Sequence, residues 1–166
     1  MDAAPLLARI AALLEHHRLE AILIGNAAAA LQGAPVTTID IDFLFRKTPA
    51  NLKKLKAMAR ELDATLLRPY YPVSGLFRIF RDSDALQIDF MSVIDGVRSF
   101  EGLRKRARAV RFGNAEIRVA GLADIIRSKK AAGRAQDTAV FGVLERTLEE
   151  TSRHTKGQAR RSQERE

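Results

Sequence analysis

Short apolar runs separated by amphipathic segments are the feature that most constrains how this chain of 166 residues can fold. The run Ala21–Ile24, closed by Gly25, is typical of a buried strand, whereas residues 5–18 carry leucine and isoleucine at helical spacing. The other expected strands are 39–45, 64–67, 76–80, 86–91, 107–112 and 115–119, and the other expected helices are 26–32, 49–62, 122–132 and 135–148. This alternation predicts one domain of mixed α/β (α+β) class, in which helices pack against a sheet of mixed strand direction.

The composition excludes several classes of site and location. The chain has no cysteine, which removes disulfides, thiolate metal sites and cysteine nucleophiles and fits a reducing cytoplasm. No apolar run approaches the roughly 20 residues of a membrane helix, and the first residues lack the pattern of a secretion signal. From Ser152 onward only Ala159 is apolar. We therefore expect a cytoplasmic protein with one domain over residues 1–151 and a disordered polar tail over residues 152–166.

Positive charge is concentrated in one segment. The chain carries 28 Lys and Arg against 20 Asp and Glu, a net charge of +8, and residues 98–134 hold 11 of the basic residues but only 3 of the acidic ones. Such a segment attracts phosphate-bearing partners, which include a triphosphate and the backbone of an RNA. A solvated surface that merely lacks acids would give the same count. A base-stacking platform is not expected, since the chain has no Trp and only 6% aromatic residues.

Two aspartates share one face of the expected strand 39–45. Because side chains alternate along a strand, Asp40 and Asp42 lie on one face, and Ile39, Ile41 and Phe43 lie on the other. Aspartate is depleted in strands, and neighbouring carboxylates repel each other unless a cation lies between them. Hard divalent cations such as Mg²⁺ take such oxygen ligands together with substrate phosphates. The alternative is a pair of aspartates at the solvated end of an edge strand.

A third carboxylate interrupts the apolar run 86–91. A buried, unpaired Asp89 would cost several kcal/mol or shift its pKa. If this strand lies beside the first, three carboxylates converge at one strand end, as in two-metal phosphoryl or nucleotidyl transfer. A surface position for Asp89, or its pairing with an arginine, is the alternative.

The turn after the first strand contains Gly25-Asn26. A glycine lets the backbone approach a phosphate closely, and a following helix offers free N–H groups. A tight strand–helix turn without a ligand is equally compatible with the same residues.

His16 and His17 end the first expected helix, where a cation is favoured near the last carbonyl groups. No carboxylate partner marks either histidine as catalytic. We expect no functional role for them.

Together these residues resemble the signature of the minimal nucleotidyltransferase family, part of the polymerase-beta-like superfamily, which includes AbiEii-like small proteins. Over residues 21–89 the resemblance rests on Gly25-Asn26, Gly33, Thr38, Asp40-Ile41-Asp42 and Asp89. Over residues 122–148, Lys129, Arg134 and Asp137 resemble the family's C-terminal helical motif. Arg134 could instead pair with Asp137 at the surface, since the two are three residues apart.

The resemblance implies a nucleotidyltransferase-like fold and Mg²⁺-dependent transfer of a nucleoside monophosphate from an NTP, such as ATP, to an acceptor hydroxyl. It assigns catalysis and the binding of two Mg²⁺ ions to Asp40, Asp42 and Asp89. It assigns nucleotide contacts to Gly25, Asn26, Thr38, Lys129 and Arg134. The acceptor it implies is an RNA, a tRNA or a protein, in a toxin–antitoxin or phage-defence setting.

Two positions depart from the family pattern. Asn26 stands where relatives have Gly or Ser, and Val36 stands where many have Arg. All three carboxylates are nevertheless kept. The alternative function is therefore a catalytically inactive protein with this fold, which binds an RNA or a protein partner as an antitoxin-like component.

Overall fold

A computed structural model describes residues 4–36, 40–68 and 75–163. Its strands form one seven-stranded sheet of order β3-β4-β5-β2-β1-β7-β6. The strands are β1 (Ala21–Ile24), β2 (Ile41–Phe45), β3 (Thr65–Leu67), β4 (Leu76–Arg81), β5 (Leu86–Met91), β6 (Arg108–Phe112) and β7 (Ala115–Val119). The pairs β1–β7 and β2–β5 are parallel, and the other pairs are antiparallel. The mixed sheet confirms the fold class that the sequence predicts.

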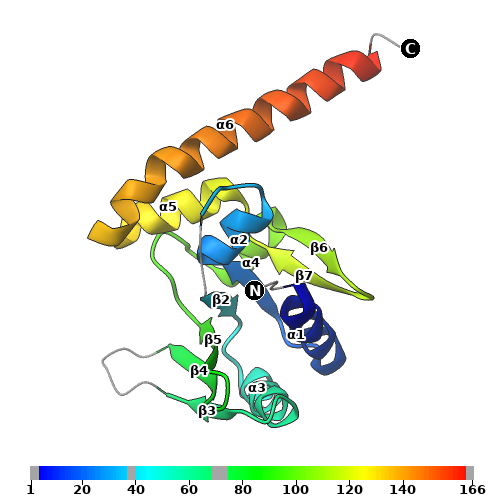
Figure 1. Ribbon diagram of the computed structural model, residues 1–166, viewed down its shortest axis with the longest axis vertical. Coiled ribbons are helices and arrows are strands. Elements are labelled where there is room, and N and C mark those ends of the chain that lie inside the picture. Colours follow the sequence, from blue (N-terminus) through cyan, green and yellow to red (C-terminus); the bar gives the residue numbers. More distant parts are fainter. Residues whose placement is uncertain (1–3, 37–39, 69–74, 164–166) are drawn as a thin grey trace.

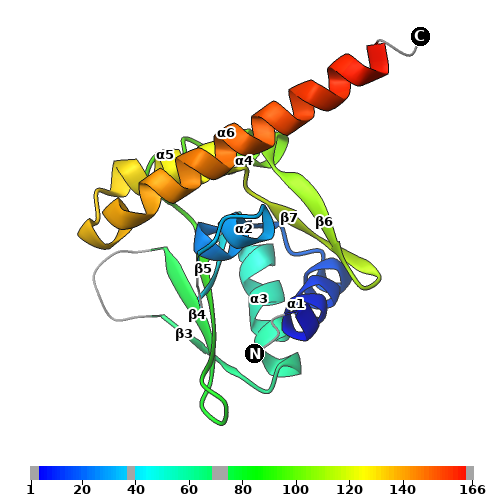
Figure 2. The same cartoon turned by 45° about the horizontal axis from the view of Figure 1, so that its top comes forward.

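In the ranges that the structure describes, six helices pack around this sheet (Figure 1). They are α1 (Ala4–His17), α2 (Gly25–Leu31), α3 (Pro49–Glu61), α4 (Phe100–Arg106), α5 (Leu122–Ala132) and α6 (Ala135–Gln163). α1 and α3 lie side by side, as Figures 1 and 2 both show. α2 follows β1 directly and contacts β1, β2 and α5, while α5 packs against α6. Among the described residues, none of the helices combines the length and the apolar character that a membrane span requires.

The central strands supply the core. Ile41, Phe43 and Phe45 of β2 are buried, as the period of two predicts. Phe43 stacks on Phe90 of β5 at a centroid distance of 5.1 Å, and Phe45 meets Phe77 of β4 edge to face at 5.6 Å. These aromatic contacts join the neighbouring strands β4, β5 and β2 and fix their relative positions.

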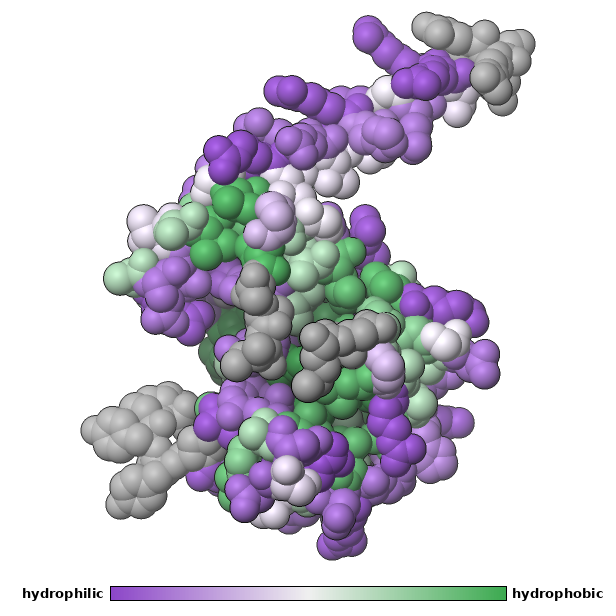
Figure 3. Space-filling model, in the orientation of Figure 1, coloured by the Kyte–Doolittle hydropathy of each residue, from purple (hydrophilic) through white to green (hydrophobic). Residues whose placement is uncertain are grey.

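Two elements differ from the sequence prediction. α4 covers residues for which the sequence predicts neither a helix nor a strand, and Ser99 caps it by accepting a hydrogen bond from the N–H of Gly102 at 3.0 Å. α6 continues to Gln163, so residues 152–163 are helical where we predicted a disordered tail. The Arg, Lys, Gln and Ala residues of that stretch have high helix propensity, which polar composition alone does not reveal. Figure 3 shows hydrophilic side chains covering this outer half of α6.

Candidate active site

Three charged residues lie in one row across adjacent strands. In the parallel pair β2–β5, Asp42 is the register partner of Asp89, and in the antiparallel pair β4–β5, Asp89 is the partner of Arg78. Ile24, the last residue of β1, is the partner of Asp42 on the other side. Register partners project on the same face of a sheet. The row therefore places two carboxylates and a guanidinium side by side where β1 ends.

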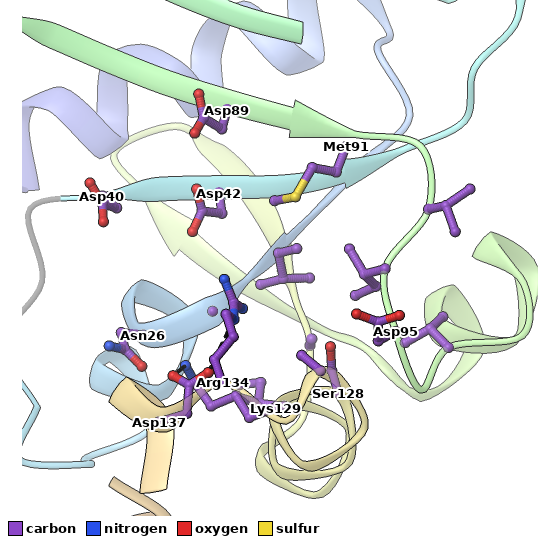
Figure 4. Close-up of a pocket in the computed structure, with 18 of the residues that line it drawn as sticks. Asn26, Asp40, Asp42, Asp89, Met91, Asp95, Ser128, Lys129, Arg134 and Asp137 are labelled. Carbon is purple, nitrogen blue, oxygen red and sulfur yellow. Dashed lines mark hydrogen bonds and ion pairs between the residues drawn. The ribbon is translucent and has the colours of Figure 1, made fainter. Parts of the chain in front are cut away.

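Asp42 lies at the centre of a group of like charges. Its pKa is raised from 3.8 to about 6, first by burial and then by the nearby negative charges of Asp89 and Asp40. The positive charges of Arg134 and Lys129 act in the opposite direction. A bound cation would relieve the same repulsion, and carboxylate oxygens are the donors that Mg²⁺ prefers. The donor set therefore fits Mg²⁺, with Asp42 placed between Asp40 and Asp89 (Figure 4).

Asp89 is held by Arg78. Nε of Arg78 donates to Oδ1 of Asp89 at 2.8 Å, and Nη2 donates to Oδ2 at 3.1 Å. The side chain of Asp89 is only 12% exposed, so this bidentate pair supplies the compensation that a buried carboxylate requires. The pairing with an arginine, which the sequence left open, is therefore present. It does not exclude a further ligand, since a carboxylate offers about four acceptor positions.

Gly25 packs against the carboxylate of Asp42. Its φ of +68° is a conformation that favours glycine, and a Cβ at this position would lie 3.2 Å from Oδ2 of Asp42. The side chain of any other residue would therefore press on the central carboxylate. The glycine after β1 is explained by this contact.

The opposite wall carries positive charge from α5 and the connection to α6 (Figure 4). Nζ of buried Lys129 donates to Oδ1 of Asp137 at 2.9 Å, and Nε of Arg134 lies 3.3 Å from Oδ2 of the same carboxylate. The Arg134 side chain is 59% exposed, so its guanidinium remains accessible to a ligand. The pairing of Arg134 with Asp137, which the sequence left open as an alternative to nucleotide contact, is therefore present. Beside them, the buried Oδ1 of Asn26 has no hydrogen-bond partner within the described part of the chain.

These two walls enclose a cleft of about 870 Å³. Its charged end contains the row of carboxylates, Arg78 and the Lys129–Asp137 pair. Met91, Asp95 and Ser128 lie farther along the cleft from Asp40 (Figure 4), and Ile94 and Ile125 add apolar surface to the lining. An anionic group and a less polar group could therefore bind at opposite ends of one continuous cleft.

Most of the predicted site residues meet in this cleft. Those that line it are Gly25, Asn26, Asp40, Asp42, Asp89, Lys129 and Arg134. Thr38 lies outside the described residues. Sequence reasoning missed Arg78, because only the register of the β4–β5 hairpin brings it opposite Asp89. The catalytic and binding roles of all these residues stay predictions.

The basic segment 98–134 does not gather at the cleft. Of its 11 cations, only Lys129 and Arg134 line the cleft, and both contact Asp137. Arg106 and Arg127 instead lie 3.0 and 3.3 Å from Oδ1 of Asp124. The charge excess is therefore partly structural and mostly spread over other surfaces.

Comparison with known proteins bears on the fold. No protein-family model matches the chain, and no curated protein matches it significantly in sequence. Solved structures do match it in shape. A protein of Thermotoga maritima (TM1012), described as a nucleotidyltransferase, has a TM-score of 0.61 and 18% identity, covering 88% of this chain and 92% of that one. ANT(2")-Ia, in complex with adenylyl-2"-tobramycin, has a TM-score of 0.62 and 15% identity, covering 96% and 97%.

The chain has a nucleotidyltransferase fold. A third structure with this fold, the lincosamide antibiotic adenylyltransferase LnuA with bound lincomycin, has a TM-score of 0.58 and 13% identity, covering 84% of this chain and 94% of that one. At such identities the likeness establishes the fold alone. The AbiEii-like subfamily stays a prediction.

Proposed function

We propose that the chain is a Mg²⁺-dependent nucleotidyltransferase, which moves a nucleoside monophosphate from an NTP to an acceptor hydroxyl and releases pyrophosphate. The observation that carries the proposal is the register pairing of Asp42 with Asp89, with Asp40 directly before β2, the strand that contains Asp42. Two carboxylates paired across a sheet, with a third close enough to raise the pKa of Asp42, repel one another unless a cation lies between them. Mg²⁺ bound by Asp40, Asp42 and Asp89 would neutralise phosphate oxygens and the developing charge on the leaving group.

Other groups of the cleft would accept the acceptor's proton and bind the triphosphate. The acceptor oxygen attacks the α-phosphorus, a new P–O bond forms, and the bond from the α-phosphorus to the bridging oxygen breaks so that pyrophosphate leaves. Oδ1 of Asp89 accepts one hydrogen bond, from Arg78, and keeps a position for the hydroxyl proton of the acceptor. The exposed guanidinium of Arg134 binds the triphosphate from the opposite wall.

The acceptor proposed from the sequence is an RNA, a tRNA or a protein. A small hydroxyl-bearing molecule is supported by a different observation. The solved structures with this fold include one holding adenylyl-2"-tobramycin and one holding lincomycin. The cations of segment 98–134 also lie largely outside the cleft. Few of them could therefore bind the phosphates of an RNA at the reacting centre.

Label transfer from each α-³²P-NTP with Mg²⁺ tests the function. The acceptors offered are tobramycin, lincomycin, bulk tRNA, other RNA and the protein itself. The variants are Asp42→Asn and Asp89→Asn, and the matched control is Asp82→Asn, an exposed carboxylate outside the cleft. We expect label in one class of acceptor, loss of more than about 100-fold in the first two variants, and no change in the control.

The inactive alternative predicts a different result. A binding protein with this fold would transfer no label to any acceptor and would bind no Mg²⁺–NTP in calorimetry. It would keep its affinity for an RNA or protein partner in Asp42→Asn and Asp89→Asn.

A further inference from the structure

A second group of potential metal ligands lies outside the cleft. His16 and His17 are the last residues of α1, and Glu61 is the last residue of α3. One ligand atom from each lies within 4.8 Å of the other two. None of the three residues lines the cleft. In the described ranges 4–36, 40–68 and 75–163, this is the one group of three such side chains at so short a spacing.

The contact between His17 and Glu61 has the length of a hydrogen bond but not the geometry of one. Nε2 of His17 lies 2.8 Å from Oε1 of Glu61. The same nitrogen is buried and makes no hydrogen bond of acceptable geometry among the described residues. A buried imidazole nitrogen without a hydrogen bond is costly. A cation that accepts both lone pairs, one from Nε2 and one from Oε1, satisfies the two atoms at once.

The surroundings leave this set of donors available. The His17 side chain is 14% exposed and the Glu61 side chain 43% exposed, and His16 is exposed, so an ion can enter from solvent. The two imidazole rings stand at 79° with centroids 4.9 Å apart. Arg9 donates to the backbone carbonyl of Glu61 rather than to its carboxylate. Apart from its contact with His17, this carboxylate has no ion pair with another side chain in the described part of the chain.

We propose that His16, His17 and Glu61 form a site for one divalent cation of the Zn²⁺ type. Two imidazole nitrogens and one carboxylate oxygen are a donor set that suits Zn²⁺, whereas Mg²⁺ prefers oxygen donors alone. Water completes the coordination, because two of the three ligands are open to solvent. The ion joins the C-terminal residues of α1 and α3, which lie side by side. Its effect is on the stability of this helix pair and is separate from the chemistry of the cleft.

Titration of the full-length protein with Zn²⁺, and with Co²⁺ as a spectroscopic probe, tests the site. Both titrations are run with Mg²⁺ in excess, so that the aspartates of the cleft are occupied. We expect saturable binding of one ion and a higher melting temperature with Zn²⁺. Each of His16→Ala, His17→Ala and Glu61→Gln should weaken binding by more than about 10-fold, since removal of a direct ligand costs at least as much as removal of a residue that supports one.

His154→Ala is the matched control. His154 is the third histidine of the chain, is exposed on the outer half of α6, and belongs to no such group. This control should bind Zn²⁺ as the wild type does. His16 is exposed, so His16→Ala should fold whether or not His17→Ala does. Unchanged affinity in His16→Ala, absence of saturable binding in the wild type, or loss of binding in Asp42→Asn instead would overturn the proposal.

Discussion

Arg78 and Asp89 face each other across β4 and β5, and one guanidinium holds both oxygens of the carboxylate. The same carboxylate is the register partner of Asp42 on its other side. Arg78 therefore compensates one member of a pair of like charges and leaves the other for a cation. The Arg78–Asp89 pair stabilises the fold and also sets the charge beside Asp42. Its removal should therefore have more than one measurable effect.

Substitution of Arg78 should change stability and metal binding in opposite directions. Arg78→Gln should lower the free energy of unfolding by about 1–3 kcal/mol, because Asp89 loses a bidentate charged partner. The same variant should bind Mn²⁺, used in place of Mg²⁺, more tightly, because no guanidinium competes for the carboxylate. Urea unfolding and Mn²⁺ electron paramagnetic resonance measure the two effects. Arg111→Gln, whose side chain is 67% exposed, should stay within about 0.5 kcal/mol of the wild type.

The raised pKa of Asp42 predicts a pH dependence of stability. The folded protein keeps a proton on Asp42 up to about pH 6, whereas the unfolded chain loses it near 3.8. Stability should therefore fall as pH rises through this window, by about 3 kcal/mol without divalent cations. Urea unfolding of the wild type and Asp42→Asn at a series of pH values isolates this effect. The variant should show a smaller fall, and Mg²⁺ should restore stability to the wild type above pH 6. Equal slopes in both proteins would contradict the assignment.

Gly25 and Gly113 form a matched pair for testing the contact with Asp42. Both have positive φ, +68° and +63°, but an added Cβ meets Asp42 only at Gly25. Gly25→Ala and Gly113→Ala should each lose about 1–2 kcal/mol from backbone strain. Only Gly25→Ala should also reduce Mg²⁺ affinity and nucleotidyl transfer. If both variants bind Mg²⁺ alike, Gly25 does not shape the carboxylate site.

Lys129 and Lys130 are neighbours on α5 with different surroundings. Lys129 is buried with Asp137, and Lys130 is 54% exposed beside Glu145. Lys129→Met should cost about 3 kcal/mol, because it leaves the buried carboxylate of Asp137 with only Arg134. Lys130→Met should cost less than about 1 kcal/mol. Chemical denaturation of both variants checks the difference. A similar loss in the two would indicate that the buried pair is not a stabilising contact.

The sequence predicted the strands of the site well but not their order. Alternation along β2 placed Asp42 opposite the buried Phe43, since a period of two is a local property, and Asp89 stood out as the one charge in an apolar run. The register that joins Asp42, Asp89 and Arg78 depends on long-range pairing, which no local pattern specifies.

The remaining differences have the same physical origin. His17 and Glu61 are 44 positions apart, and only the packing of α1 on α3 brings them together. α4 begins at a cap that a single serine provides, and the outer part of α6 has helix propensity but almost no apolar pattern. Patterns of hydrophobicity detect elements that are buried on one face, so elements with little burial escape them.

The parallel pairing of β2 with β5 has a consequence for how the chain has to fold. The two aspartates are separated by α3, β3 and β4, so they become neighbours only after this whole connection has closed. The repulsion between Asp42 and Asp89 is thus felt by the native state and hardly at all by the unfolded chain. Replacing Asp42 with an uncharged residue would therefore relieve this repulsion in the native state with little effect on the unfolded chain.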